Sequence, residues 1–128
     1  MFSLQKKTAI VTGGGSGIGK AIAELFAVRE ADVYILELNK AAADETVRVI
    51  TAAGGTAAGF AVNVSDQGQV KETISTIVQK AGRVDILVNS AGISHIGTLE
   101  STLEEDFDKI YQVNIKGVYN VMHEVIPY

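Results

Sequence analysis

Five glycines crowd the segment TGGGSGIG at residues 12–19, where their spacing could serve to bind a phosphate group. Glycine lets a backbone turn tightly and approach a ligand without a Cβ in the way. A helix that begins here would offer unpaired N–H groups and the positive end of its dipole to a pyrophosphate. The common G-x-G-x-x-G spacing is absent, and Gly13-x-x-x-Gly17-x-Gly19 follows Thr12 instead. We predict that the site uses Gly13, Gly15, Ser16, Gly17, Ile18 and Gly19.

Two other interpretations of this loop stay open. Residues 14–20 fit the G-x-x-x-x-G-K pattern of nucleotide hydrolases, but Ala21 stands where that motif needs a Ser or Thr hydroxyl for magnesium. The loop could also be merely flexible, although flexibility gives it no reason to lie between a buried strand and an amphipathic helix. The dinucleotide interpretation is therefore favoured.

An acidic residue at the end of the second strand, about 20 positions beyond such a loop, can bind the adenosine ribose hydroxyls. Glu37 in YILELN stands 18 residues after Gly19, with Leu38 beside it. Alone it would be a solvated carboxylate, but together with the loop it favours ribose binding. Its charge would repel the 2′-phosphate of NADP, and Ser16 rather than a basic residue precedes Gly17. Both features predict NAD rather than NADP.

Apolar runs that alternate with amphipathic segments must position these residues. The apolar runs predict buried strands at 8–12, 32–38, 57–64 and 84–89. Helical periodicity follows each run, at 16–30, at 40–53, at 65–82 and from about Thr102, where Thr102 and Glu105 have capping-box spacing. This alternation predicts an α/β fold, a doubly wound parallel sheet of Rossmann type. The glycine loop then lies between the first strand and the first helix.

Two of the helical patterns lead to specific expectations. On the first helix, we expect Ile18, Ile22, Leu25 and Phe26 to share one apolar face. On the fourth, Asn114 falls on an apolar stripe formed by Phe107, Ile110, Tyr111, Val118, Val121, Met122 and Val125. A buried amide in the middle of a helix costs stability unless it is hydrogen-bonded. Asn114 is thus either a functional residue or a packing residue satisfied by a neighbouring backbone group.

Composition narrows the function classes. The 128 residues are 47% hydrophobic and 20% charged, with one proline, and predict a single domain over residues 1–128. A net charge of −4 without a basic cluster argues against nucleic-acid binding. The absence of cysteine excludes disulfides and thiolate sites, and two histidines do not suggest a metal site. No segment has the pattern of a signal peptide or a membrane span. We expect a cytoplasmic protein that acts on a small molecule.

Three motifs together resemble the short-chain dehydrogenase/reductase family. TGGGSGIG matches that family's T-G-x-x-x-G-x-G loop, and NSAG at 89–92 is similar to its N-N-A-G motif, with Ser90 in place of the second Asn. VNIKG at 113–117 resembles the helical segment that carries the family's catalytic Asn, here Asn114. The motifs stand in the family's order and at its separations, and the resemblance covers essentially the whole chain.

The resemblance implies further roles for individual residues. Asn63 and Val64 stand where the family usually has Asp-Val against the adenine. Residues 89–92 would line the nicotinamide-side ribose and brace the glycine loop, through Asn89, Ala91 and Gly92. Asn114 would help to hold a water that connects to the catalytic lysine. His95 would lie near the mouth of the substrate pocket, as a surface or wall residue rather than a catalytic one.

The resemblance also implies an activity, NAD-dependent hydride transfer between the nicotinamide and an alcohol or carbonyl substrate. The family's Y-x-x-x-K segment is absent, since Leu38, Ile115 and His123 stand four positions after Tyr34, Tyr111 and Tyr119. We expect the chain to be the cofactor-binding half of such an enzyme, truncated before its catalytic Ser and Tyr. The alternative is a catalytically incompetent fragment that acts through NAD binding or assembly.

By the same resemblance, the four strands would lie in the order 3-2-1-4, and the full-length protein would be a homodimer or homotetramer. The family commonly has a glycine at the turn after the first helix, where this chain has Glu30. Either that helix ends differently or Glu30 carries backbone strain.

Overall fold

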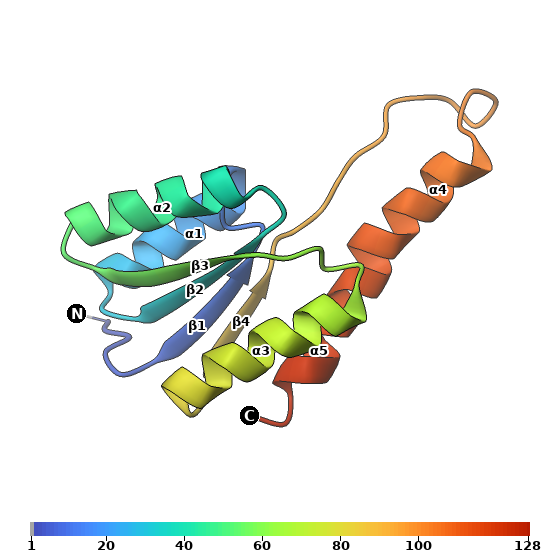
Figure 1. Cartoon of the computed structure of the whole chain (residues 1–128). Helices are drawn as coiled ribbons and strands as arrows, with labels where there is room; N and C mark the ends of the chain where they lie inside the picture. Colours follow the sequence, from blue (N-terminus) through green and yellow to red (C-terminus); the bar gives the residue numbers. More distant parts are fainter. Residues whose placement is uncertain (1) are drawn as a thin grey trace.

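A parallel sheet with the strand order β3-β2-β1-β4 forms the centre of the computed structural model, which describes residues 2–128. The strands are β1 (Thr8–Thr12), β2 (Asp32–Glu37), β3 (Thr56–Ala61) and β4 (Ile86–Asn89). The helices are α1 (Gly17–Val28), α2 (Lys40–Ala52), α3 (Gln67–Ala81), α4 (Glu104–Tyr111) and α5 (Gly117–Val125), with the π-helical segment η1 (Gln112–Lys116) between the last two. Helices α1 and α2 cover one face of the sheet, and α3 and α5 cover the other (Figure 1). The predicted α/β Rossmann-type fold and strand order are confirmed.

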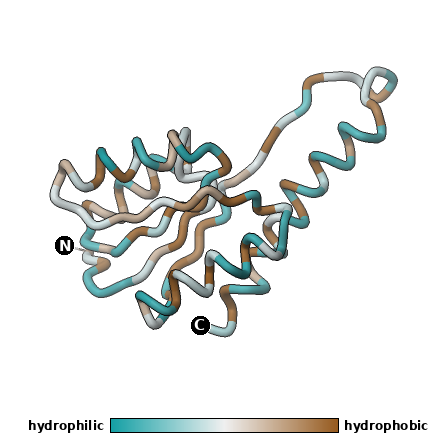
Figure 2. Tube along the Cα trace, viewed as in Figure 1, coloured by the Kyte–Doolittle hydropathy of each residue, from teal (hydrophilic) through white to brown (hydrophobic). Residues whose placement is uncertain are grey.

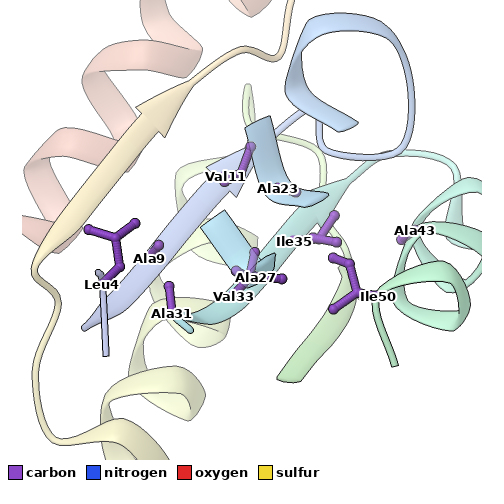
Figure 3. Packing of buried hydrophobic residues seen from close by; sticks show 10 residues of the cluster. All are labelled: Leu4, Ala9, Val11, Ala23, Ala27, Ala31, Val33, Ile35, Ala43 and Ile50. Atoms are coloured by element: carbon purple, nitrogen blue, oxygen red, sulfur yellow. The ribbon is translucent and has the colours of Figure 1, made fainter. Parts of the chain in front are cut away.

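The core between the sheet and helices α1 and α2 is built largely from small residues on the helix side. Figure 3 shows Ala23 and Ala27 against the strands, with Ile50 closing the layer. Helix α1 buries Gly19, Ala23 and Ala27, whereas Ile18 and Leu25 are 76% and 54% exposed. The apolar face predicted from Ile18, Ile22, Leu25 and Phe26 is therefore not the buried face of α1, because the helix packs on the sheet through its small residues. Ile22 and Phe26 pack at the margin of this core.

The second core, between the sheet and helices α3 and α5, follows the sequence pattern more directly. Val70, Ile74 and Ile77 are buried on α3, and Val121 and Val125 are buried on α5. The two edge strands are shorter than predicted, since β3 ends at Ala61 and β4 begins at Ile86. Both are only half-buried, because each has a neighbouring strand on one side alone. In Figure 2 hydrophobic colours run along much of the strands, whereas the helices alternate between hydrophilic and hydrophobic residues.

The final helical region differs from the single helix predicted from about Thr102. Helix α4 begins at Glu104, and the Asp106 carboxylate accepts a hydrogen bond from the Leu103 N–H at 3.1 Å. Thr102 Oγ1 instead donates to the Thr98 carbonyl at 2.7 Å, so the capping prediction for Thr102 and Glu105 is wrong. Helix α4 extends beyond the sheet (Figure 1), which leaves Phe107 exposed. Only the α5 part of the predicted stripe reaches the core.

The turn after α1 confirms one of the two possibilities set out for Glu30. Its φ angle is +75°, a left-handed conformation that favours glycine. The Glu30 N–H still donates to the Ala27 carbonyl, and the Ala31 N–H donates to the Phe26 carbonyl. The helix therefore ends as it would with glycine, and Glu30 carries the backbone strain.

Candidate functional site

A cavity of about 820 Å³ opens at the carboxyl ends of the strands, where ligands bind in open parallel sheets. The glycine loop, the ends of β2 and β3 and the segment after β4 all contribute to it. The predicted residues that line it are Gly13, Ser16, Gly17, Ile18, Glu37, Leu38, Asn63, Val64, Ala91 and Gly92. Tertiary structure thus brings four separate predicted segments to one cavity.

Gly13 sits where the glycine loop and the segment after β4 approach most closely. Its φ angle is +64°, and a Cβ there would come within 2.8 Å of the Ala91 Cα and backbone N. A Cβ on Gly19 would stand 2.3 Å from the Gly13 carbonyl oxygen. Any side chain at either position would push the loop apart. These two glycines are therefore required for close backbone packing, a role distinct from direct contact with a ligand.

The start of helix α1 is open to an anion. Asn39 caps α2 by accepting from the Ala42 N–H, and Asp66 caps α3 by accepting from the Gln69 N–H. Ser16 at the start of α1 makes no such side-chain bond within residues 2–128. At Gly17, with φ +54°, an added Cβ would meet no described heavy atom within 4 Å. The start of α1 thus has no side-chain cap and has open space beside Gly17, two features that a helix N-terminus needs in order to bind a phosphate group.

Thr12, the last residue of β1, ties the start of the glycine loop to the segment after β4. Its buried Oγ1 accepts hydrogen bonds from the Ser90 N–H at 3.1 Å and the Ala91 N–H at 3.0 Å. One hydroxyl at the end of β1 therefore fixes the segment after β4. These two hydrogen bonds give a structural reason for the Thr that precedes the glycine run. The spacing of the glycines alone gave no such reason.

Asn63 and Val64 form the wall of the cavity after β3. Asn63 Oδ1 accepts from the Ser65 N–H at 3.1 Å and from the Ser65 hydroxyl at 2.6 Å. The Asn63 N–H donates to Gln69 Oε1 at 3.1 Å. The carboxamide oxygen is thus engaged in its own turn, which makes the NH₂ group the polar end left for a ligand. Val64 is buried and presents an apolar surface.

Asn114 lies in η1, and both ends of its carboxamide bind the backbone of one residue. Asn114 Oδ1 accepts from the Ile93 N–H at 2.9 Å, and Asn114 Nδ2 donates to the Ile93 carbonyl at 2.8 Å. This arrangement is the backbone-satisfied packing role that the sequence left open beside a functional one. The segment is π-helical, with the Gly117 N–H donating to the Gln112 carbonyl five residues earlier, and such turns are frequent at functional sites.

Several predicted residues lie outside the lining of this cavity. Gly15 lies against Glu37, and Asn114 lies near Gly92. Asn89 instead lines a shallower hollow between β4 and the end of α5. His95 is exposed on the loop after β4, with Nε2 4.0 Å from Asp106 Oδ2.

Sequence reasoning missed other lining residues, among them Ile93, Lys109, Gln112 and Val113. It also missed Asn120, which is fully buried in α5 and donates from Nδ2 to the Val64 carbonyl at 2.8 Å. A polar residue within an apolar helical stripe was a usable signal for Asn120, as it was for Asn114. The other four could not be found from motif spacing, because the path of the chain after β4 places them.

Across residues 2–128, no group of three or more His, Cys, Asp or Glu side chains is placed to hold a metal ion. The helices of the same stretch are all too short or too polar to cross a bilayer.

Comparison with known proteins identifies relatives along the whole chain. A family model described as short chain dehydrogenase matches residues 7–128. The 3-oxoacyl-(acyl-carrier-protein) reductase FabG of Thermotoga maritima is 42% identical over 125 residues, which cover 98% of this chain and 51% of the relative. The D-threitol dehydrogenase of Mycolicibacterium smegmatis is 35% identical over 92% of this chain and 45% of its own length. The chain spans about half the length of the curated relatives it matches.

Solved structures give the same result in three dimensions. A dehydrogenase/reductase from Sinorhizobium meliloti 1021 superimposes with a TM-score of 0.95 at 38% identity, over 99% of this chain and 51% of that one. A hydroxysteroid dehydrogenase from Escherichia coli gives a TM-score of 0.93 at 32% identity, over 98% and 53%. The similarity therefore extends over every element described above.

Proposed function

Because the chain belongs to the short-chain dehydrogenase family, a family of oxidoreductases that use nicotinamide cofactors, we propose that it forms the NAD-binding half of such an enzyme. The enzyme would transfer a hydride between the nicotinamide and an alcohol or carbonyl substrate. One observation carries the proposal: the uncapped start of α1 and the carboxylate of Glu37 open into the same cavity. A phosphate site beside a ribose-binding carboxylate is what a dinucleotide requires.

The residues divide the cavity into regions with different chemistry. The N–H groups at the start of α1, at Gly17 and Ile18, would hold the pyrophosphate. Glu37 would accept from the adenosine ribose hydroxyls, with the apolar Val64 as a wall for the adenine. Ala91 and Gly92, fixed in part by Thr12, would line the nicotinamide end. When bound, the nicotinamide supplies the site that gives or takes the hydride, and the protein residues orient it.

NAD should be preferred over NADP, because a 2′-phosphate would place a second negative charge beside Glu37. Calorimetric titration of the chain with each dinucleotide tests this proposal. Replacement of Glu37 by Ala should weaken NAD binding and narrow the preference. Glu72 is exposed on α3 and does not line the cavity. Glu72→Ala therefore removes one negative charge at a site remote from the ligand, and it should leave the affinities for NAD and NADP unchanged. Equal affinity for NAD and NADP in the unsubstituted chain would contradict the choice of cofactor.

A second candidate function follows from what the sequence contains and lacks. Asn114 is present but no Y-x-x-x-K segment is, and a tyrosine with a lowered pKa is the proton donor or acceptor of the family. These 128 residues would then bind NAD without turnover and act through binding or assembly. Hydride transfer, followed by NADH absorbance in a preparation free of host dehydrogenases, should be undetectable. Turnover that disappears in Asn114→Ala would overturn this second proposal.

Assembly into a homodimer or homotetramer stays a prediction, supported by the exposed apolar side chains along α4, η1 and α5. These are Phe107, Tyr111, Ile115, Tyr119 and Met122. Apolar surface of this extent on one helical region commonly marks an interface. Phe107→Ser should lower the sedimentation-derived mass of the assembly, and a monomeric parent chain would contradict the prediction. The cytoplasmic location likewise stays a prediction.

A further inference from the structure

Two asparagines on the last helical region hold opposite walls of the cavity. Asn114 in η1 binds the backbone of Ile93, which follows β4. Asn120 in α5 binds the carbonyl of Val64, which follows β3. Strands β3 and β4 are the two edges of the sheet. One continuous helical region therefore forms hydrogen bonds with the loops that follow both edge strands, at opposite ends of the cavity. No motif of the sequence predicted the hydrogen bond from Asn120 to Val64.

The environment of Asn120 determines how its carboxamide must lie. The side chain is 0% exposed, and its NH₂ group faces the Val64 carbonyl at 2.8 Å. The facing group is an acceptor, so the oxygen of the carboxamide cannot take this place without repulsion. Gly117, one turn earlier, adds a second contact, since a Cβ there would stand 2.7 Å from Val64 Cγ2. Helix α5 therefore contacts both the backbone carbonyl and the side chain of Val64.

The cost of burying Asn120 indicates a role beyond packing. Its Oδ1 is buried with no hydrogen-bond partner in the part of the chain that the structure describes. An unpaired buried acceptor is unfavourable by comparison with an apolar side chain of similar size. Val121 and Val125, which are buried on the same helix, are both apolar. The compensating benefit is the bond to Val64, which fixes the wall of the cavity.

We propose that Asn120 is a positioning residue for the adenosine end of the dinucleotide, acting through the Val64 carbonyl. The proposal rests on the function proposed above, because it assigns Val64 to the adenine wall. Asn120 does not line the cavity, so its effect must pass through the loop that begins at Val62. The pair Asn114 and Asn120 then makes the helical region a common support for both ends of the cofactor.

The test compares Asn120→Leu with Thr46→Val. Thr46 is a fully buried polar residue of α2 that bonds to the Ala42 carbonyl within its own helix and does not line the cavity. Three probes are titrated: 5′-AMP and inorganic pyrophosphate by NMR, and NAD by calorimetry. Asn120→Leu should raise the Kd of 5′-AMP and of NAD about fivefold while that of pyrophosphate is unchanged. Thr46→Val should change none of the three.

Hydrogen exchange supplies a readout that does not depend on any ligand. The amides of Ser65 and Asp66 should exchange faster in Asn120→Leu than in the unsubstituted chain, and at the original rate in Thr46→Val. If Asn120→Leu does not fold, Asn120→Ser, whose hydroxyl is too short to span the gap, takes its place in both measurements. Unchanged AMP affinity and unchanged exchange would overturn the proposal. If the unsubstituted chain binds neither AMP nor NAD, both the proposed function and this inference fail. If the unsubstituted chain binds them and Asn120→Leu binds them equally well, only this inference is overturned.

Discussion

The backbone of Gly15 lies directly against the side chain of Glu37. A Cβ at residue 15 would stand 2.7 Å from Glu37 Cγ, 2.9 Å from Glu37 Cδ and 2.8 Å from Ala42 Cβ. Glycine at this position therefore keeps free the space in which the Glu37 side chain lies. The role of Gly15 differs from that of Gly13, which lets two loops approach each other.

Gly15→Ala should displace Glu37 from its place beside the loop and weaken NAD binding more than NADP binding. We expect a loss of NAD affinity of about fivefold, the cost of one weakened charged hydrogen bond. Calorimetric titration of both dinucleotides measures it. In Gly14→Ala the added Cβ would meet Ile35 Cγ2 at 2.8 Å and not Glu37, so that variant should keep the NAD preference. An unaltered preference in Gly15→Ala would show that the contact does not control Glu37.

Thr12→Val should destabilise the fold, because it leaves two backbone donors without their acceptor. Thr12 is 1% exposed, and the Ser90 and Ala91 N–H groups both bind its hydroxyl. We expect the free energy of unfolding in urea to fall by about 2 kcal/mol. Thr12→Ser keeps the hydroxyl and should recover most of this loss. A Thr12→Val variant as stable as the unsubstituted chain would contradict the role assigned to the hydroxyl.

Asn114→Ala should release the segment after β4 from the helical region. Both polar groups of Ile93 lose their partner, so its amide should exchange faster and stability should fall by about 1 kcal/mol. Hydrogen exchange with chemical denaturation measures both effects. Gln112→Ala, at an exposed position in the same π-helical segment, is the matched control and should alter neither. Protection of Ile93 that survives in Asn114→Ala would contradict this account.

Asp85 should make stability depend on pH in the acid range. The Thr8 N–H donates to Asp85 Oδ2 at 2.9 Å, and this bond, together with Arg83 and Lys7, holds the pKa of the carboxyl below its usual value. A lowered folded pKa contributes stability above the unfolded pKa of about 3.9 and loses it as the pH falls through the folded value.

Asp85→Asn should therefore lower the Tm at pH 7, and the difference from the unsubstituted chain should shrink below a pH of about 4. In that range the original carboxyl is itself becoming neutral. Thermal melts across the pH range measure this convergence. Asp108→Asn, at an exposed position on α4, should change the Tm little at any pH. A gap that stays constant down to acid pH would exclude the charge of Asp85 as its cause.

Glu30→Gly should stabilise the protein, because φ is +75° at this residue and glycine adopts that angle without a Cβ penalty. The gain should be about 0.5 to 1 kcal/mol, reduced slightly by loss of the exposed bond from the Ser3 hydroxyl to Glu30 Oε2. Arg29→Gly is the control, since Arg29 has a φ of −87° and should only lose stability. Chemical denaturation compares the two, and a destabilised Glu30→Gly would refute the assignment of strain.

Much of the fold followed from local sequence patterns, and the places where prediction failed share a cause. Apolar runs and helical periodicity located β1, α2 and α3 closely, because each depends on residues near one another in the chain. On α1 the most hydrophobic face is not the one that packs on the sheet. Ala23 and Ala27 are less hydrophobic than Ile18 and Leu25, but their small size lets the helix approach the sheet. Hydrophobicity ranks residues one at a time, whereas packing depends on the distance between layers.

The sequence by itself determined the α/β alternation, the glycine run at the end of β1 and the acidic residue at the end of β2, since each is a local pattern of residue types. Tertiary structure alone decided that Thr12 binds the segment after β4, that Asn114 binds Ile93 and that Asn120 binds Val64. These bonds join residues 79, 21 and 56 positions apart. No local pattern specifies such pairs, because they form only after the sheet and its helices have brought the loops together.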